Sequence, residues 1–375
     1  MPVMNFLTTC IFDHGAIGQL AKTLKGQGVT KAFVVTDPGI KSIGLLDKVL
    51  EQIDIPCDVF AETEPNPTET QAKQASEVFK ASGCDGIIAL GGGSSMDIAK
   101  AIGLIATHEP PFEQYGALVG GARKIKAIPP LIAIPTTAGT GSEVSIGAVI
   151  ILENGRKETI VSNHLIPKVA ICDPSLTLGL PPMLTAATGM DAVTHCIEAI
   201  LVPAPNPPAE GIGYDGVARA IGDGWLKKAV QDGSDPDARW HMMMASYEGA
   251  LAFVKGLGGV HALSHAAGRL HDLKLHHGTL NAIWLPHLLR HNVGSADEKY
   301  ARLRKMMNLP ESADLGDAIA KLIQDIGIPE KLSDIGLTAA HGETVVDYAL
   351  KDLAHATNSK KLDRADYEKL YEIAL

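Results

Sequence analysis

The stretch Ile88-Ala89-Leu90-Gly91-Gly92-Gly93-Ser94-Ser95-Met96-Asp97-Ile98-Ala99-Lys100 decides the fold class. A short apolar run enters three glycines and a helical pattern follows, which is typical of a buried strand that turns directly into a helix. Glycines let a phosphate approach the backbone, and the N–H groups at a helix start bind anions. The same pattern is also typical of a tight turn without a ligand. The stretch therefore predicts α/β structure and a candidate phosphate loop.

Strand and helix patterns alternate on both sides of this loop. Strands are expected at 31–37, 57–60, 86–90 and 131–135, and helices at 44–53 and 68–82. This alternation predicts a parallel sheet covered on both faces. A hairpin is expected from 144–152 and 158–161, with its turn at Glu153-Asn154-Gly155-Arg156.

The chain changes character near Leu180-Pro181-Pro182. Strand patterns then disappear, and long amphipathic runs remain at 184–201, 213–230, 237–253, 260–270 and 280–291. We therefore expect an α/β domain over 1–180 and an all-α domain over 181–375.

Composition limits the partners and the compartment. The chain has 33 Lys and Arg against 43 Asp and Glu, a formal net charge of −10, which argues against nucleic-acid and anionic-membrane partners. Its five scattered cysteines form no CxxC pair, which indicates reduced thiols. The first residues lack the pattern of a signal peptide, and no apolar run is long enough for a membrane span. We expect a cytoplasmic protein.

Four residues in the second half are of the types that bind divalent metals: Asp191, His195, His261 and His277. Asp191 and His195 are four residues apart in an expected helix, so their side chains lie on one face. One carboxylate and three imidazoles suit Fe(II) or zinc and leave positions for a substrate oxygen. A histidine on a helix is more often a packing or surface residue, and the chain has 14 of them. Spacing alone leaves both interpretations open.

Other runs offer groups for a dinucleotide. Asp37 ends the first clear strand and is a candidate for the ribose hydroxyls, although Asp37-Pro38-Gly39 is also turn chemistry. A standard Rossmann unit has this acid after the glycine loop, whereas here it comes before. An acid there would repel a 2′-phosphate, which favours NAD over NADP. The hydroxyl-rich run 134–144 suits a nicotinamide or no ligand at all, and Lys157 suits the cofactor or solvent.

Taken in order, these motifs resemble the iron-dependent, or group III, alcohol dehydrogenases along nearly the whole chain. The matching motifs are Asp37-Pro38-Gly39, Pro65-Asn66-Pro67-Thr68, Gly91-Gly92-Gly93-Ser94 with Asp97 and Lys100, Pro135-Thr136-Thr137, Gly141-Ser142-Glu143, Asp173-Pro174, Thr188-Gly189-Met190-Asp191 with His195, Gly258 to His265, His277-Gly278 and Leu285-Pro286-His287.

The resemblance implies a dehydroquinate synthase-like architecture with the active site in a cleft between the two domains. It implies metal ligation by Asp191, His195, His261 and His277, pyrophosphate binding by Gly92, Gly93 and Ser94, nicotinamide contacts by Thr136 and Thr137, ribose binding by Asp37, and further cofactor contacts by Asn66, Asp97, Ser142 and Lys157. It also implies a small or medium alcohol or its aldehyde as substrate, and a homodimer or larger homo-oligomer.

One departure from the family concerns the last metal ligand. His261 and His277 are 16 residues apart, which is longer than the family commonly has. A loop over 269–276 absorbs the difference. This makes His276 a competitor for His277, and we favour His277 because Gly278 follows it as in the family pattern.

In the expected reaction a divalent ion polarises the alcohol oxygen and the adjoining carbon gives a hydride to NAD. His265, one turn after His261, is the candidate proton relay, although it is also a typical packing residue. Asn66, Phe253 and His265 are candidate neighbours of the substrate. The alternatives are a metal-free carbonyl reductase like maleylacetate reductase, a lyase like dehydroquinate synthase, and a binding protein without catalysis. The lyase would need a basic cluster, and none is found near the ligand motifs.

Overall fold

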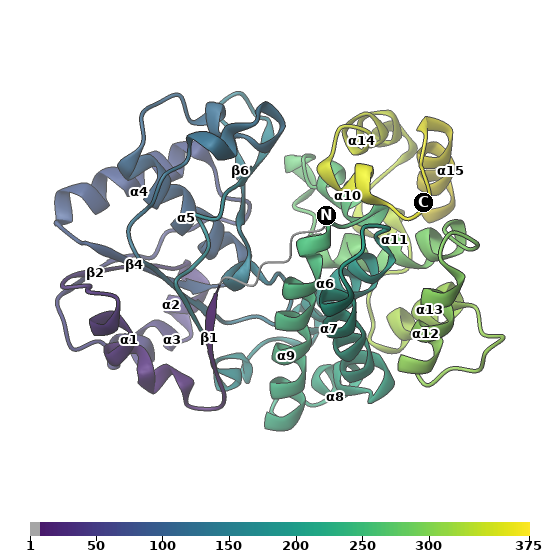
Figure 1. The fold of residues 1–375 in the computed structure, drawn as a ribbon, viewed down its shortest axis with the longest axis horizontal. Helices are drawn as coiled ribbons and strands as arrows, with labels where there is room; N and C mark the ends of the chain where they lie inside the picture. Colours follow the sequence, from purple (N-terminus) through teal and green to yellow (C-terminus); the bar gives the residue numbers. More distant parts are fainter. Residues whose placement is uncertain (1–7) are drawn as a thin grey trace. The chain divides into compact units, whose positions relative to one another are not determined.

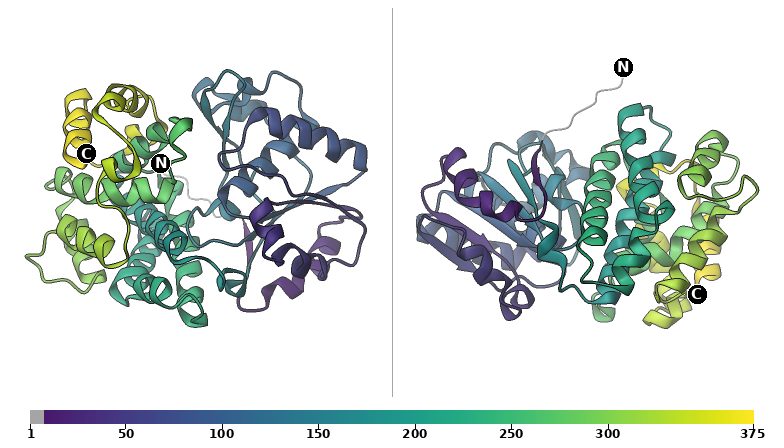
Figure 2. Two further views of the ribbon diagram at one scale, coloured as in Figure 1. Left: turned by 180° about the vertical axis from the view of Figure 1, so that it is seen from behind. Right: turned by 90° about the horizontal axis from the view of Figure 1, so that it is seen from below.

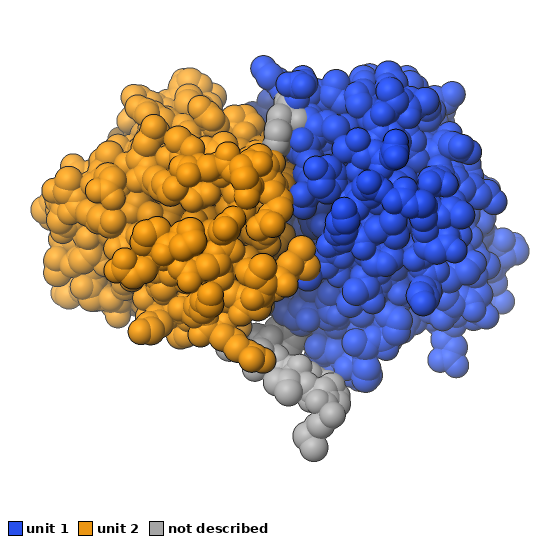
Figure 3. Space-filling view, turned by 90° about the horizontal axis from the view of Figure 1, so that it is seen from above, with its two compact units in different colours: residues 1–5, 138–140, 178–375 blue, residues 6–137, 141–177 orange. Residues whose placement is uncertain are grey.

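The computed structural model describes residues 8–375, with His271 described by its backbone alone. Contacts divide these residues into two compact units, drawn in different colours in Figure 3. Residues 8–137 and 141–177 form what we call the sheet unit. Residues 138–140 and 178–375 form what we call the helical unit.

The sheet unit is built on a parallel sheet that has six strands within the described residues, in the order β1-β8-β5-β4-β2-β3 (Figure 1). The strands are β1 (Thr9–Phe12), β2 (Ala32–Val35), β3 (Cys57–Phe60), β4 (Gly86–Gly91), β5 (Leu131–Pro135) and β8 (Val169–Cys172). The helices are α1 (Leu20–Gly26), α2 (Pro38–Ser42), α3 (Leu45–Leu50), α4 (Glu69–Ser82) and α5 (Gly93–Thr107). The predicted α/β fold with a parallel sheet is confirmed.

Alternating side chains of the strands face two separate layers. On β2, Phe33 and Val35 pack with α4 and α5, and on the other face Ala32 and Val34 pack with α1 and α3. Figure 1 shows α4 and α5 on one side of the sheet and α1 and α3 on the other. Both faces are therefore buried, which explains why the strands read as continuous apolar runs.

The strand order reverses between β2 and β4. From β2 the chain goes outward to β3, and then returns to the other side of β2 to form β4 and, beyond it, β5. In open parallel sheets, ligands bind at the carboxyl ends of the strands where the order reverses. The residues that follow β2 and β4 are therefore the first place to look for a ligand.

The predicted hairpin is present, as an antiparallel pair of β6 (Gly147–Ile151) and β7 (Lys157–Val161). It begins later than expected, because Ser142–Val144 form a 3₁₀ turn. The strands β1 and β8 were not predicted. Each has four residues, the same length as β2 and β3, which were predicted.

The helical unit contains no strand among its described residues, which confirms the predicted all-α second half (Figure 2). Its α-helices are α6 (Pro182–Leu201), α7 (Pro207–Val217), α8 (Trp225–Gln231), α9 (Pro236–Ala252), α10 (Gly259–Ala267), α11 (His277–His291), α12 (Asp297–Met306), α13 (Leu315–Asp325), α14 (Gly342–Ala349) and α15 (Arg364–Ala374). Among residues 8–375, no helix has both the length and the apolar character of a membrane span.

The amphipathic run over 213–230 is helical but is not one continuous helix. After α7 the chain forms a π-helical turn at Ala218–Gly222, and Gly224 has a left-handed backbone with φ 78° before α8 begins. The apolar pattern continues across this break because both helices pack into the same core, so periodicity did not reveal it.

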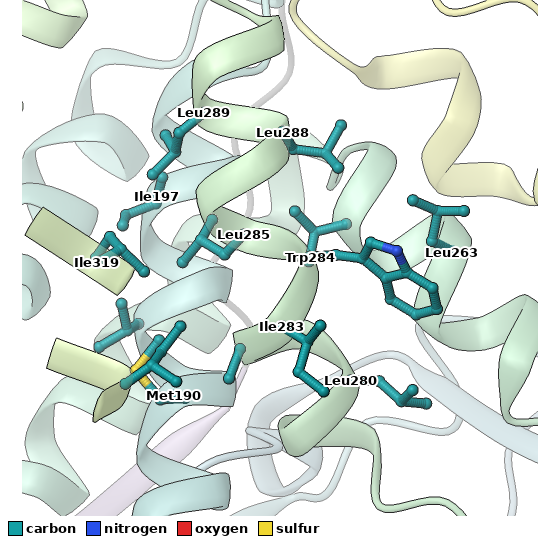
Figure 4. Close-up of a cluster of buried hydrophobic side chains, with 14 of the residues drawn as sticks. Met190, Ile197, Leu263, Leu280, Ile283, Trp284, Leu285, Leu288, Leu289 and Ile319 are labelled. Atoms are coloured by element: carbon teal, nitrogen blue, oxygen red, sulfur yellow. The ribbon is translucent and has the colours of Figure 1, made fainter. Parts of the chain in front are cut away.

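The core of the helical unit is centred on α6 and α11. Trp284 on α11 is fully buried, and Leu263, Leu280 and Leu288 lie around its indole in Figure 4. Met190 and Ile197 of α6 belong to the same cluster. The helices that carry the candidate metal ligands are thus held by the largest apolar cluster of this unit.

This packing predicts that Trp284→Ala lowers the free energy of unfolding by about 3–5 kcal/mol, because it leaves a cavity in a closed core. Urea unfolding followed by circular dichroism measures the change. Val293→Ala is the control: Val293 is 56% exposed, and its replacement should cost no more than about 0.5 kcal/mol. Equal costs for the two variants would contradict the assignment of Trp284 to the core.

Candidate functional site

The four predicted metal ligands meet in the helical unit. Asp191 and His195 lie on α6, His261 on α10 and His277 at the first position of α11 (Figure 1). Asp191 Oδ1 lies 3.7 Å from Nε2 of His195, 3.7 Å from Nε2 of His261 and 3.6 Å from Nε2 of His277. Three imidazoles from three helices therefore point at one carboxylate oxygen.

These distances fit a shared cation better than hydrogen bonds. An N–H···O hydrogen bond spans about 2.7–3.2 Å, so separations of 3.6–3.7 Å are too long. Ligand atoms that each lie about 2.0–2.2 Å from one ion are separated by about 3–4 Å from each other. The donor atoms of Asp191, His261 and His277 all lie within 4.8 Å of one another, and His195 joins them through Asp191. The residues present fit a divalent metal.

The charges of the cluster lead to the same conclusion. Burial raises the pKa of Asp191, but the neighbouring histidines outweigh it and hold that pKa well below its usual range. Burial lowers the pKa of His195 to about 4, although Asp191 opposes the shift. Burial also lowers the pKa of His261, but Asp191 and Glu198 outweigh it and raise that pKa to about 9. The carboxylates of Asp191 and Glu198 thus favour a positive charge on His261, which a bound metal would supply in place of a proton.

Close packing of helices brings these ligands together. The start of α11 lies so near α6 that a Cβ on Gly278 would come 2.0 Å from the carbonyl oxygen of Ala187. Only glycine permits this approach, and it brings the adjacent His277 to Asp191. This is the physical reason for the His-Gly pair in the sequence.

Three further groups of the site were missed by the sequence analysis. The Nδ2 of Asn281, on α11, donates to Asp191 Oδ1 at 2.8 Å. Glu198 on α6 lies 2.7 Å from His261 Nδ1, and the carbonyl of Gly139 lies 3.2 Å from His195 Nδ1. Glu198 could have been found, because it follows His195 by three residues and Asp191 by seven on the same helix face. Asn281, four residues after His277, was available by the same rule.

The predicted relay His265 lies against the metal cluster. Its ring stacks on that of His277 with centroids 5.2 Å apart, and it lies 5.7 Å from that of His261. Its Nδ1 is 3.1 Å from Asp352 Oδ2, a partner that the sequence did not indicate. Burial raises the pKa of Asp352, but His265 outweighs it and keeps that pKa below its usual value. Phe253 also lies nearby, with its ring 4.9 Å from that of His195.

In the sheet unit, the inverted order of Asp37 and the glycine loop is resolved by the strand order. Asp37 follows β2 and the glycines end β4, and these strands are neighbours in parallel. Ser95 Oγ consequently lies 3.4 Å from Asp37 Oδ2. Asp37 also caps α2, where its Oδ1 accepts from the Ile40 N–H at 3.0 Å. Both expected roles of Asp37, turn residue and ligand-side acid, are compatible with this position.

The phosphate-binding candidates and the two threonines share the same edge of the sheet. The N–H of Thr136 donates to the carbonyl of Gly91, and a Cβ on Gly92 would lie 3.4 Å from Thr137 Oγ1. In the described chain no side chain caps α5 at Gly92. The free N–H groups of its first turn, which includes Ser94, suit an anion.

Asp97 and Ser142 are tied into the protein by a buried lysine. Lys100 Nζ donates to Ser142 Oγ at 2.9 Å and to the carbonyls of Ser142, Ser145 and Gly147. Asp97 accepts from Ser142 Oγ at 2.8 Å and from the Val149 N–H at 3.0 Å. Burial lowers the pKa of Lys100 to about 8, although the nearby carboxylates of Asp97 and Glu143 oppose the shift. The structure thus gives these residues a role in holding the loop after β5, and their direct contact with a cofactor stays a prediction.

Asn66 and Lys157, two distant residues expected at the cofactor, lie together. Lys157 Nζ donates to Asn66 Oδ1 at 3.2 Å. Asn66 adopts a left-handed backbone with φ 56°, next to Thr68, which forms an isolated bridge with Ile151 of the hairpin. The hairpin therefore positions Lys157.

Comparison with known proteins gives one family for both halves of the chain. A family model described as iron-containing alcohol dehydrogenase matches residues 8–174. A model described as the C-terminal part of the Fe-containing alcohol dehydrogenase family matches residues 185–375.

Individual proteins resemble the chain over its whole length. It is 46% identical to the 4-hydroxybutyrate dehydrogenase of Cupriavidus necator over 382 aligned residues, with 99% of each chain covered. Among solved structures, 1,3-propanediol oxidoreductase matches with a TM-score of 0.94 and 34% identity, with 100% of both chains covered. The sulfoacetaldehyde reductase of Bifidobacterium kashiwanohense, in complex with NAD⁺, matches with a TM-score of 0.89 and 26% identity, covering 100% of this chain and 98% of the other.

The geometry predicts which of two adjacent histidines binds metal. His277 lies at Asp191, whereas His276 precedes α11 as its N-cap residue and does not belong to the cluster found among the described residues. His277→Ala should weaken metal binding by more than about 100-fold, since even loss of an outer partner of a ligand costs about 10–100-fold. His276→Ala should leave it unchanged. Metal analysis after dialysis against a chelator distinguishes the two, and the opposite ranking would assign the site to His276.

Proposed function

Because the chain belongs to the iron-containing alcohol dehydrogenase family, as its motifs predicted, we propose that it is a metal-dependent, NAD-linked dehydrogenase that interconverts a small or medium alcohol and its aldehyde. The observation that carries this proposal is the convergence of Asp191, His195, His261 and His277 on one point. A carbonyl reductase that works without a metal would not need these four side chains at one point.

The four converging residues would hold a divalent ion, Fe(II) by family membership, with zinc or another divalent metal also compatible with the donors. When bound, the ion supplies Lewis acidity toward an alcohol or carbonyl oxygen. Asn281 orients the Asp191 carboxylate by its hydrogen bond of 2.8 Å, and the Gly139 carbonyl orients His195. The residues 181–375 are proposed as the metal-binding and catalytic domain.

Residues 1–180 are proposed as the dinucleotide-binding domain. Gly92, Gly93 and Ser94 would receive the pyrophosphate at the uncapped start of α5, and Asp37 the ribose hydroxyls. Thr136 and Thr137 would contact the nicotinamide half, with Asn66, Asp97, Ser142 and Lys157 as further candidate contacts. When bound, NAD accepts a hydride from the carbon that carries the alcohol oxygen. A relative of the same fold binds NAD⁺, which supports this choice of cofactor.

His265 is proposed to move the proton that the alcohol loses. Asp352 accepts the hydrogen bond of its Nδ1–H, which leaves Nε2 as the nitrogen that takes up a proton. The stacking of His265 on His277 places it beside the metal cluster, within one helical turn of His261. Asn66 and Phe253 stay candidates for contact with the substrate.

The first substrate to test is 4-hydroxybutyrate, because the relative at 46% identity is named for it. 1,3-Propanediol comes next, since the structural neighbour at 34% identity is named for it. We also propose that the protein acts in the cytoplasm as a homodimer or larger homo-oligomer. The free cysteines support the compartment, and the assembly is carried over from the resemblance of the sequence to the family.

The test is a metal analysis and NADH assay of protein prepared with and without oxygen. With 4-hydroxybutyrate, 1,3-propanediol and short primary alcohols, NADH should form, disappear with a chelator and return with Fe(II) or zinc. Activity that survives complete metal removal would favour the metal-free reductase. Full metal occupancy without hydride transfer to NAD or NADP would favour the lyase or the binding protein.

The position of Asp37 predicts the choice between the two dinucleotides. Asp37→Asn keeps the acceptor that caps α2 and removes the negative charge. Its efficiency with NADP relative to NAD should rise about tenfold or more, because two charges at about 4 Å interact by about 1–4 kcal/mol near a protein surface. Steady-state kinetics with both cofactors measure the ratio. Asp47→Asn, at an exposed position of α3, is the control and should not change the ratio. An unchanged ratio in Asp37→Asn would remove Asp37 from the ribose site.

The contacts of His265 predict a variant that binds metal but turns over slowly. His265→Ala should lower kcat by about 10²–10⁴-fold, the usual contribution of a general acid or base, and should keep its metal. Asp352→Asn should lower kcat less, because the imidazole remains. Turnover measured from pH 6 to pH 10 checks this, and a pH profile of His265→Ala that overlies the wild type would exclude the relay.

A further inference from the structure

We propose that Glu198 is a positioning residue that fixes the orientation of His261 and the nitrogen that carries its proton, and thereby sets the affinity of the metal site. The inference rests on the metal-binding part of the proposed function. Glu198 is buried on α6, on the face that carries Asp191 and His195. Its Oε2 lies 2.7 Å from Nδ1 of His261 on α10.

The same carboxylate holds the start of α10. Glu198 accepts from the N–H of Gly258 at 2.9 Å, of Val260 at 2.8 Å and of His261 at 3.4 Å. Asn358 Oδ1 accepts the remaining N–H, that of Gly259, at 3.0 Å. The unpaired N–H groups of a helix start are thus capped by two side chains from elsewhere in the unit.

The position of the Glu198 carboxylate depends on a glycine just before α10. A Cβ on Gly258 would lie 2.7 Å from Glu198 Oε1 and 2.8 Å from Asn358 Oδ1, so the approach requires glycine at this position. Backbone and ring of His261 are consequently held by one group. Rotation of the imidazole would break its bond to Glu198, and movement of α10 would break the others.

The chemistry of the acceptor decides which nitrogen of His261 is protonated. The carboxylate oxygens of Glu198 accept from three backbone N–H groups, so Nδ1 of His261 is the hydrogen-bond donor to Oε2, and Nε2 is the nitrogen left to bind a metal. Nε2 is the atom that lies 3.7 Å from Asp191 Oδ1. The amide nitrogen of Asn281 lies 3.3 Å from Nε2 of both His261 and His277. Carboxylate partners of metal-bound histidines have this role in general.

Glu198→Gln isolates the effect because it keeps the shape and changes the hydrogen-bonding pattern. If the amide oxygen stays with the backbone N–H groups, the amide nitrogen faces Nδ1 as a donor and moves the proton to Nε2, where the metal binds. If the amide is rotated by half a turn, its nitrogen faces the backbone N–H groups, so that hydrogen-bond donors face each other. Either arrangement opposes the geometry that binds metal.

The experiment titrates metal-free wild type and Glu198→Gln with Zn(II) against a chromophoric chelator at fixed pH. The affinity of Glu198→Gln should be about 10–100-fold lower. Asn358→Ala is the matched control, because it removes a cap from the same helix start without touching His261. Its affinity should stay within about threefold of wild type, within the usual context dependence of such contacts. Thermal unfolding of the metal-free proteins shows whether both variants fold.

Equal affinity of wild type and Glu198→Gln would overturn the proposal, as would an equal loss in Asn358→Ala, which would assign the effect to the helix start. If Glu198→Gln does not fold, zinc-loaded wild type decides by histidine ¹⁵N NMR, with the His261 signals assigned by their loss in His261→Ala. A protonated Nδ1 and a zinc-bound Nε2 support the proposal, and the reverse overturns it. Failure of wild type to bind zinc or iron would instead overturn the metal-dependent function together with this inference.

Discussion

The buried carboxylate of Asp191 is the constraint on which the helical unit depends. From Thr185 to Leu201 every residue of α6 is buried, so a charge on this helix has no access to bulk water. An isolated carboxylate in such a place is costly unless cations and donors surround it. Three imidazoles at 3.6–3.7 Å and the Asn281 amide at 2.8 Å supply that environment. The crossing of α6, α10 and α11 is therefore fixed by charge as well as by the apolar cluster around Trp284.

The sheet unit solves a different problem, that of collecting residues from distant segments at one edge. In a parallel sheet the carboxyl ends of all strands lie on the same side, and a reversal of strand order opens a place for a ligand. Asp37 and the glycine loop, which are more than 50 residues apart in the sequence, become neighbours because β2 and β4 pair directly. The Nζ of Lys100 then holds the loop after β5 through hydrogen bonds of 2.6–3.0 Å to four oxygen acceptors. The order of the strands in the sheet, and not the order of the motifs along the chain, brings these residues together.

The sequence could predict those features that leave a local periodic pattern or a recognisable motif. The i, i+4 spacing placed Asp191 and His195 on one helix face, and the alternation of strands and helices indicated the parallel sheet. The family resemblance, and not spacing, supplied the pairing with His261 and His277. Asp352 and Gly139 could not be found, because their contacts with His265 and His195 arise only when segments distant in sequence pack together. The break after α7 was hidden because apolar packing continues across it.

The central claim is that one divalent metal is held by Asp191, His195, His261 and His277. Anomalous diffraction at the iron edge, from crystals of protein prepared without oxygen and supplied with Fe(II), tests it most directly. The account predicts one strong peak about 2.0–2.2 Å from Asp191 Oδ1 and from the three Nε2 atoms. A peak ligated by His276 in place of His277, or no peak at this cluster in an active protein, would contradict it.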